Sequence, residues 1–254
     1  MIRVLVTGVR LQLLQLMRSG FDISAMLIWP IVLASIAFYL LDGKESPELL
    51  FAASLGTAVM MMWAQVVVGA GGALDNQRVF GTLELLVAAP VPLVSTIAPI
   101  MIGAGAFGVY GLVTTILWGR LLFGIPITIH DPFAFAVALP ACVIAIGLLG
   151  LITASTFVLY RSAFALGIAM QYPVWIVTGL LFPLSLLPAW VGPISWLLAP
   201  TWGFRALKEA AFGGSPWSSI GMCAVVSVVY LVISLVCLAY FERLARARAS
   251  LRLA

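Results

Sequence analysis

The stretch DNQRVFGTLELLVAAPVP, residues 75–92, is polar at its start and separates two long apolar runs. Residues 49–74 precede it, and residues 93–119 follow it. Each run exceeds the roughly 20 apolar residues that an α-helix needs to cross a bilayer. The sequence therefore predicts two membrane-spanning helices joined by a segment that lies outside the hydrocarbon core.

The joining segment has the pattern of a short amphipathic helix. Gly81 and Thr82 offer an N-terminal turn or cap, and Pro90 ends the helical pattern. Its apolar side is formed by Leu83, Leu85, Leu86 and Val87. Glu84 falls in the first turn, where a carboxylate is favoured by the positive end of the helix dipole. An ordinary connecting loop is the alternative that these residues leave open.

Composition places the whole chain in the membrane. Of its 254 residues, 63% are hydrophobic and 9% are charged, which is more apolar surface than a soluble core can bury. We predict an all-α polytopic membrane protein with one domain. Its six transmembrane helices are expected at residues 23–41, 49–74, 93–119, 133–159, 163–187 and 218–241. The arginines cluster at span ends rather than in a stripe with aromatic residues, so nucleic acid is not an expected partner.

Two further segments are predicted to lie at the membrane surface. In residues 1–20, Arg3, Arg10 and Arg18 share one side of a helical wheel, which indicates an interfacial amphipathic helix in contact with membrane lipids. Residues 188–217 are too interrupted by proline to cross the bilayer and too apolar to stay in water. We expect one or two re-entrant helices there, dipping from the outer face and packed on protein.

The distribution of positive charge predicts the orientation. An even number of spans puts both termini on one side, and with both termini cytoplasmic the inner segments carry nine arginines against four outer cations. The inner set is Arg3, Arg10, Arg18, Arg78, Arg161, Arg243, Arg246, Arg248 and Arg252, and the outer set is Lys44, Arg120, Arg205 and Lys208. The same orientation places residues 75–92 in the cytoplasm.

GTLELLVAAP, with an arginine three residues before its glycine, resembles a signature of type-2 ABC exporter permeases, close to E-R-x-x-G-T-L-E-x-L-x-x-x-P. The matching positions are Arg78, Gly81, Thr82, Leu83, Glu84, Leu86 and Pro90. Gln77 stands where the family usually has Glu, so the role of that carboxylate is not carried over. The resemblance implies that residues 75–92 form a cytoplasmic coupling helix. It also implies separate ABC ATPase subunits, and a second permease copy or a paralogue, as partners in the cell membrane.

The sequence offers little catalytic chemistry of its own. It contains no G-x-x-x-x-G-K-[ST] phosphate-binding loop, so the resemblance places ATP and Mg²⁺ on the partner subunit. His130 is the only histidine, and Cys142, Cys223 and Cys237 lie in apolar runs without paired spacing. We expect a permease that is not itself an enzyme and that holds no cofactor or metal. The alternative, an intramembrane enzyme, would require a set of catalytic groups, and the sequence shows none.

A few uncharged polar residues within the predicted spans are candidates for lining a transport pathway. They are Gln65, Tyr110, Thr114 and Gln171. Hydrogen bonding between helices is the alternative role for such residues. A weakly polar lining suits outward movement of a hydrophobic or amphipathic solute, such as a drug, an antibiotic or a lipid-like molecule. The resembled family also exports polysaccharides and lipid-linked glycans.

A different class, an ATP-independent secondary transporter or channel, would be marked by ionisable residues inside the spans or by an inverted repeat. The sequence has neither mark.

Overall fold

The computed structural model describes residues 2–18, 20–41, 47–72, 77, 80–81, 93–124, 127, 129–159, 163–180, 184 and 187–252. Its elements in order are α1 (Ile2–Arg18), α2 (Gly20–Leu41), α3 (Pro47–Gln65), the π-helical segment η1 (Val66–Ala70), α6 (Leu93–Phe123), α7 (Pro132–Leu159), α8 (Ala163–Val177), α9 (Val191–Leu197), α10 (Ala199–Phe212) and α11 (Pro216–Arg252). The structure is 90% helical, with no strand in these ranges. The predicted all-α fold is confirmed.

Within the described ranges, four segments are long and apolar enough to cross a membrane: Glu48–Val68, Val94–Leu122, Pro132–Ser155 and Pro216–Tyr240. The shortest of them has 21 residues, against the roughly 20 that a span requires. Gly167–Val177 is a shorter apolar helix. Several long apolar helices in one chain are the architecture of a multi-pass membrane protein.

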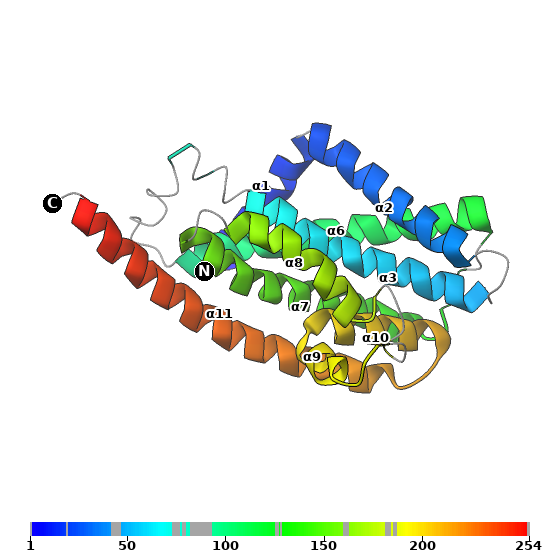
Figure 1. Ribbon diagram of the computed structural model, residues 1–254. Helices are drawn as coiled ribbons and strands as arrows, with labels where there is room; N and C mark the ends of the chain where they lie inside the picture. Colours follow the sequence, from blue (N-terminus) through cyan, green and yellow to red (C-terminus); the bar gives the residue numbers. More distant parts are fainter. Residues whose placement is uncertain are drawn as a thin grey trace.

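Helix α3 lies at the centre of the bundle. Of the 18 most apolar consecutive residues of Glu48–Val68, 83% are buried, against 28% of the corresponding residues of Pro216–Tyr240 in α11. Helices α6 and α7 pack beside α3, while α1 and α2 cover one side and α11 runs along α7 on the other (Figure 1). The apolar segment Pro216–Tyr240 of α11 thus meets protein along one side only, and its remaining surface is open.

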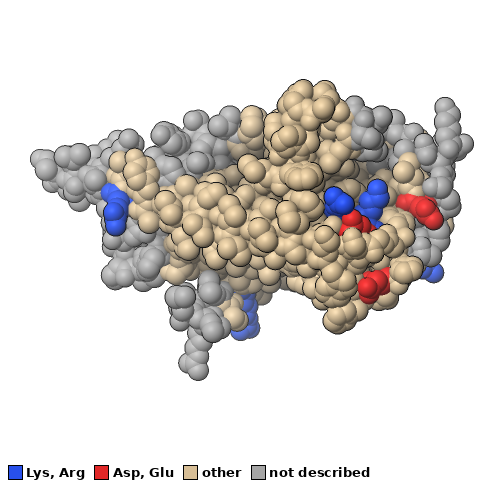
Figure 2. All heavy atoms as spheres, turned by 90° about the horizontal axis from the view of Figure 1, so that it is seen from below, with Lys and Arg blue, Asp and Glu red and all other residues tan. Residues whose placement is uncertain are grey.

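The molecular surface carries its charge near the ends of the bundle. In Figure 2, Lys, Arg, Asp and Glu side chains gather towards one end of the face in view, Lys or Arg side chains alone lie towards the other end, and uncharged residues lie between them. Exposed residues of α11 such as Val225, Val232 and Val236 are apolar. A bundle with such an uncharged zone fits a hydrocarbon layer bounded by two polar interfaces.

Helix α10 closes one end of the bundle, which we call the α10 end. The backbone N–H of His130 donates to the Ala211 carbonyl oxygen over 3.0 Å, which ties the start of α7 to α10. The rings of Phe51 in α3 and Phe212 in α10 meet edge to face, with centroids 5.5 Å apart. Helices α9 and α10 both fall within residues 188–217, where the sequence predicts short re-entrant helices.

Close backbone contact at Gly203 fixes α10 against α7. An ideal Cβ built on Gly203 would lie 2.4 Å from the Cys142 Sγ atom and 3.0 Å from its Cβ atom. A larger residue at position 203 would have to displace the Cys142 side chain of α7. Cys142, like Cys223, is buried and is not disulfide-bonded.

Two helix boundaries differ from the predicted spans. Helix α8 ends at Val177 rather than near residue 187, because Gly179 adopts a left-handed φ of 74° and its N–H bonds back to Ile176 over 3.1 Å. Helix α11 continues to Arg252 rather than ending near residue 241. Its last part is rich in Ala, Arg and Leu, which are strong helix formers, and contains neither Gly nor Pro.

Helix α3 passes into a π-helical segment, Val66–Ala70, before the chain reaches residues 75–92. This segment packs tightly on α7, since an ideal Cβ on Gly150 would lie 2.1 Å from the Val66 Cγ1 atom. Single π-helical turns inside α-helices are rare and occur often at functional sites.

Candidate functional site

Of the seven residues that match the coupling-helix signature, Gly81 is the one within the described part of the chain. Arg78, Thr82, Leu83, Glu84, Leu86 and Pro90 lie outside the described residues. Gly81 lies in a turn with a φ of 70°, a conformation that residues with a side chain rarely adopt. Its neighbour Phe80 is 77% exposed, and nothing approaches within 4 Å of an ideal Cβ at Gly81. The turn therefore lies at the surface.

The position of this turn follows from the course of α3 and α6. Helix α3 begins at the α10 end and the chain is helical to residue 72, while α6 begins at Leu93 and runs back towards the α10 end. Residues 73–92 thus connect two of the four candidate spans, and the Phe80–Gly81 turn lies at the opposite end of the bundle from α10 (Figure 1).

The four predicted pathway residues do not form one cluster. Thr114 donates from Oγ1 to the Tyr110 carbonyl oxygen over 2.9 Å, so this pair shares one face of α6. The Tyr110 side chain is 42% exposed and stacks on Phe107, with ring centroids 6.3 Å apart. Gln65 is half-buried where α3 meets η1, and Gln171 is buried on α8. Among the described residues, only Tyr110 and Thr114 of these four are joined by a hydrogen bond.

Three buried polar atoms lack a hydrogen-bond partner among the described residues: Trp63 Nε1, Trp175 Nε1 and Gln171 Oε1. They belong to α3 and α8, two helices in direct contact. A buried donor or acceptor without a partner costs about 1–3 kcal/mol, so such atoms are expected to meet a water molecule or a polar ligand. Gln171 was predicted from the sequence, whereas the two tryptophans were not. The sequence feature that could have identified Trp63 and Trp175 is their position inside predicted spans, because tryptophans usually lie at span ends.

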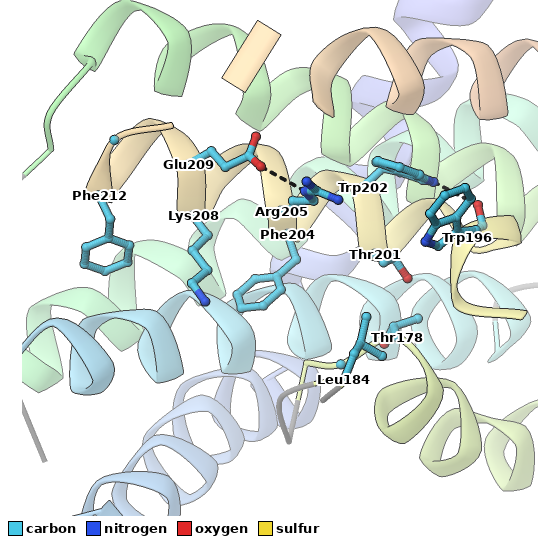
Figure 3. A pocket seen from close by; sticks show the side chains of 12 residues that line it. Thr178, Leu184, Trp196, Thr201, Trp202, Phe204, Arg205, Lys208, Glu209 and Phe212 are labelled. Atoms are coloured by element: carbon cyan, nitrogen blue, oxygen red, sulfur yellow. Dashed lines mark hydrogen bonds and ion pairs between the residues drawn. The ribbon is translucent and has the colours of Figure 1, made fainter. Parts of the chain in front are cut away.

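A pocket of about 430 Å³ lies at the α10 end. Helix α10 forms one wall, and the Thr178–Gly179 turn after α8, together with Leu184, forms the opposite wall (Figure 3). Trp196 of α9 closes one end. The lining is mainly apolar and includes Phe204, Lys208 and Phe212. We did not predict this pocket from the sequence. The pattern that marks it is Phe204, Lys208 and Phe212, which recur at four-residue intervals and so lie on one face of a helix.

No group of three or more His, Cys, Asp or Glu residues within the described ranges is arranged to hold a metal ion.

Comparison with known families agrees with this architecture. The family model described as "ABC-2 type transporter" matches residues 3–212, from α1 to the end of α10. A search of curated proteins finds no match. The matched region contains three of the four candidate spans and the segment that includes Gly81. In this family the membrane domain is the permease component of an ABC transporter, which associates with an ABC ATPase subunit. The chain belongs to the ABC-2 type transporter family.

Proposed function

We propose that this chain is the membrane-spanning subunit of an ATP-driven exporter in the cell membrane. Separate ATPase subunits bind ATP and Mg²⁺, and a second permease copy or a paralogue completes the transporter. The cargo is a hydrophobic or amphipathic solute, such as a drug, an antibiotic or a lipid-like molecule, and it moves outward. In this proposal, the two spans beyond the four long apolar segments are α2 and the stretch that begins with α8, a helix of 15 residues.

The observation that carries this proposal is the exposed Phe80–Gly81 turn, which lies in the connection between α3 and α6, at the end of the bundle opposite α10. The excess of arginine in the proposed inner segments puts that end in the cytoplasm, where an ATPase subunit is accessible. The α10 end then faces outward. Closure of the ATPase subunits on residues 75–92 moves α3 and α6, the two helices to which this segment is attached.

A charge reversal at Glu84 tests the coupling role. The full chain is co-purified with its ATPase subunit, and substrate-stimulated ATP hydrolysis is measured. Glu84→Lys is expected to weaken co-purification about tenfold, as loss of one interfacial charge contact does, and to lower export and stimulated hydrolysis together. The dipole penalty at a helix start, about 0.3–1 kcal/mol, is too small to prevent folding.

Glu48→Lys is the matched control. Glu48 is exposed in the first turn of α3, at the α10 end, so its reversal carries a similar dipole penalty at the opposite end of the bundle. Export and ATPase recovery should remain normal in this variant. Equal losses in both variants would show a general effect of charge on folding, and normal coupling in Glu84→Lys would overturn the proposed role of residues 75–92.

A further inference from the structure

The pocket at the α10 end has the size of a small-molecule site, since ligand pockets are typically about 300–1,000 Å³ in volume. Its volume is about 430 Å³. It lies away from Gln65, Tyr110, Thr114 and Gln171, none of which lines it. It is also at the opposite end of the bundle from the Gly81 turn. Its chemistry is therefore separate from coupling.

The charged residues described in the pocket wall leave one cation unmatched. The Arg205 Nε atom pairs with Glu209 Oε1 at 2.8 Å (Figure 3). The other carboxylate oxygen accepts a hydrogen bond from Ser219 Oγ over 2.6 Å. The Arg205 guanidinium also lies 5.6 Å from the centre of the Trp202 ring. Lys208 makes no ion pair with a described residue. Arg205, Lys208 and Glu209 together give this wall one net positive charge.

The hydroxyl groups in the wall are already engaged. Thr178 donates from Oγ1 to the Val174 carbonyl oxygen over 2.6 Å, and the Thr201 and Ser195 hydroxyls are 3.2 Å apart. The Lys208 ammonium is therefore the cation of this wall that has no ion-pair partner among the described residues, and an ammonium can only donate hydrogen bonds. A ligand atom that meets it must be an acceptor, and a charged acceptor matches the net charge of the wall.

Aromatic side chains flank this cation. In Figure 3, the Lys208 side chain points in the same direction as Phe204 and Phe212, one helical turn away on either side. Leu184 and Trp196 extend the apolar lining beyond Phe204. A ligand that fills the pocket has to present a negative group to Lys208 and an apolar body to these residues.

We propose that this pocket binds an amphipathic monoanion, with its carboxylate or phosphate at Lys208 and its apolar body between Phe204, Leu184 and Trp196. This inference adds a ligand class and a site to the proposed function, but binding at this site requires no ATPase. The anion has two possible sources, an exported solute on its way out or a phospholipid of the adjacent leaflet. Both sources share the chemistry that the pocket recognises.

Binding is measured on the full chain in phosphatidylcholine nanodiscs, with a long-chain fatty acid brominated on its chain as the probe. Bromine quenches tryptophan fluorescence on contact, and Trp196 and Trp202 line the pocket. Lys208→Met retains the length and apolar stem of the side chain but removes its charge. We expect it to weaken binding of the fatty acid about tenfold, as loss of a hydrogen bond to a charged group does. In a Trp196→Phe variant the quenched amplitude should fall, which places the probe in this pocket.

Two comparisons control for charge and for hydrophobicity. Arg120→Met removes another exposed cation near the α10 end, outside the pocket wall, and should leave the affinity unchanged. The brominated alcohol with the same chain should bind the original chain and Lys208→Met equally. Undiminished fatty-acid binding in Lys208→Met, or alcohol binding as tight as acid binding, would overturn the proposal.

The same measurement separates the two sources. Brominated phosphatidylglycerol is added to the disc. If it quenches Trp196 and competes with the fatty acid, the ligand is a lipid headgroup. Fatty-acid binding without this competition identifies a solute. Because no ATPase is present, failure of this proposal is distinct from failure of the coupling role tested at Glu84.

Discussion

The Tyr230 hydroxyl group, in the middle of α11, donates a hydrogen bond to the main-chain carbonyl oxygen of Leu197, where α9 ends. The same hydroxyl oxygen accepts a hydrogen bond of 3.3 Å from the N–H of Ala199, the first residue of α10. One side chain thus satisfies both backbone groups that the break between α9 and α10 exposes. The position of α10 depends on this contact with a helix far along the chain.

Tyr230→Phe is expected to destabilise the α10 end. It leaves a buried N–H and a carbonyl oxygen unpaired, at a cost of about 1–3 kcal/mol. The apparent unfolding temperature of the detergent-solubilised chain should fall, and the α9–α10 junction should be cut faster by protease. Tyr172→Phe is the control, because the exposed Tyr172 keeps its edge-to-face contact with Trp175 when only the hydroxyl is removed. A similar unfolding temperature in both variants would show that the Tyr230 hydroxyl does not fix this junction.

Gly203→Ala is expected to separate α10 from α7. The added methyl group overlaps Cys142 and should cost about 1–3 kcal/mol, as overpacking in a core does. Combining it with Cys142→Ala removes the Sγ atom 2.4 Å away and should recover part of the lost stability. The measurement is the apparent unfolding temperature of the single and double variants. Gly221→Ala, at an exposed α11 position with nothing within 4 Å, should not lower it. Absence of rescue in the double variant would contradict the Gly203–Cys142 contact.

Gly81→Leu is expected to impair coupling to the ATPase. A leucine at a φ of 70° strains the turn by about 1–2 kcal/mol, while nothing else near this position is displaced. Gly124→Leu, at a φ of 63° and also in open space, imposes the same strain after α6, near the α10 end. Substrate-stimulated ATP hydrolysis should fall in the first variant only. Gly81→Asn should retain more activity than Gly81→Leu, because Asn tolerates this conformation better. Equal loss at positions 81 and 124 would argue against a specific role of the Gly81 turn.

Accessibility of introduced cysteines tests the proposed orientation. In a chain from which Cys142, Cys223 and Cys237 have been removed, Ser215→Cys should react with a membrane-impermeant maleimide on intact cells, because Ser215 is exposed at the α10 end. Ser250→Cys, near the end of α11, should react only after the cells are opened. Labelling of Ser250→Cys but not of Ser215→Cys on intact cells would reverse the orientation.

The long apolar runs were sufficient to predict the helical fold, because a bilayer core permits little else in a chain of this composition. Helix ends depended on local backbone geometry instead. Gly179 ends α8 within a continuous apolar run, so hydropathy gave no signal of it. Conversely, the predicted sixth span ended at residue 241, whereas the helix propensity of the basic segment that follows extends α11 to Arg252.

The candidate sites were less accessible to prediction. Lys208 was counted only as an outer charge, because sequence alone cannot show that Glu209 is already paired with Arg205 and Ser219. The burial of Trp63 and Trp175 likewise depends on how α3 and α8 meet. Gly81, which the sequence places in an N-terminal turn or cap, lies in a turn with a positive φ, and the helix predicted after it lies outside the described residues.

The π-helical segment Val66–Ala70 determines the direction in which the chain leaves α3. A turn with one extra residue shifts the angular phase of everything after it by about 100° relative to an uninterrupted α-helix, which has 3.6 residues per turn. The chain therefore continues towards residues 75–92 from a different side of the helix axis than the apolar pattern of α3 alone predicts. Removing a single residue from Val66–Ala70 would restore a regular helix and redirect the segment that follows it.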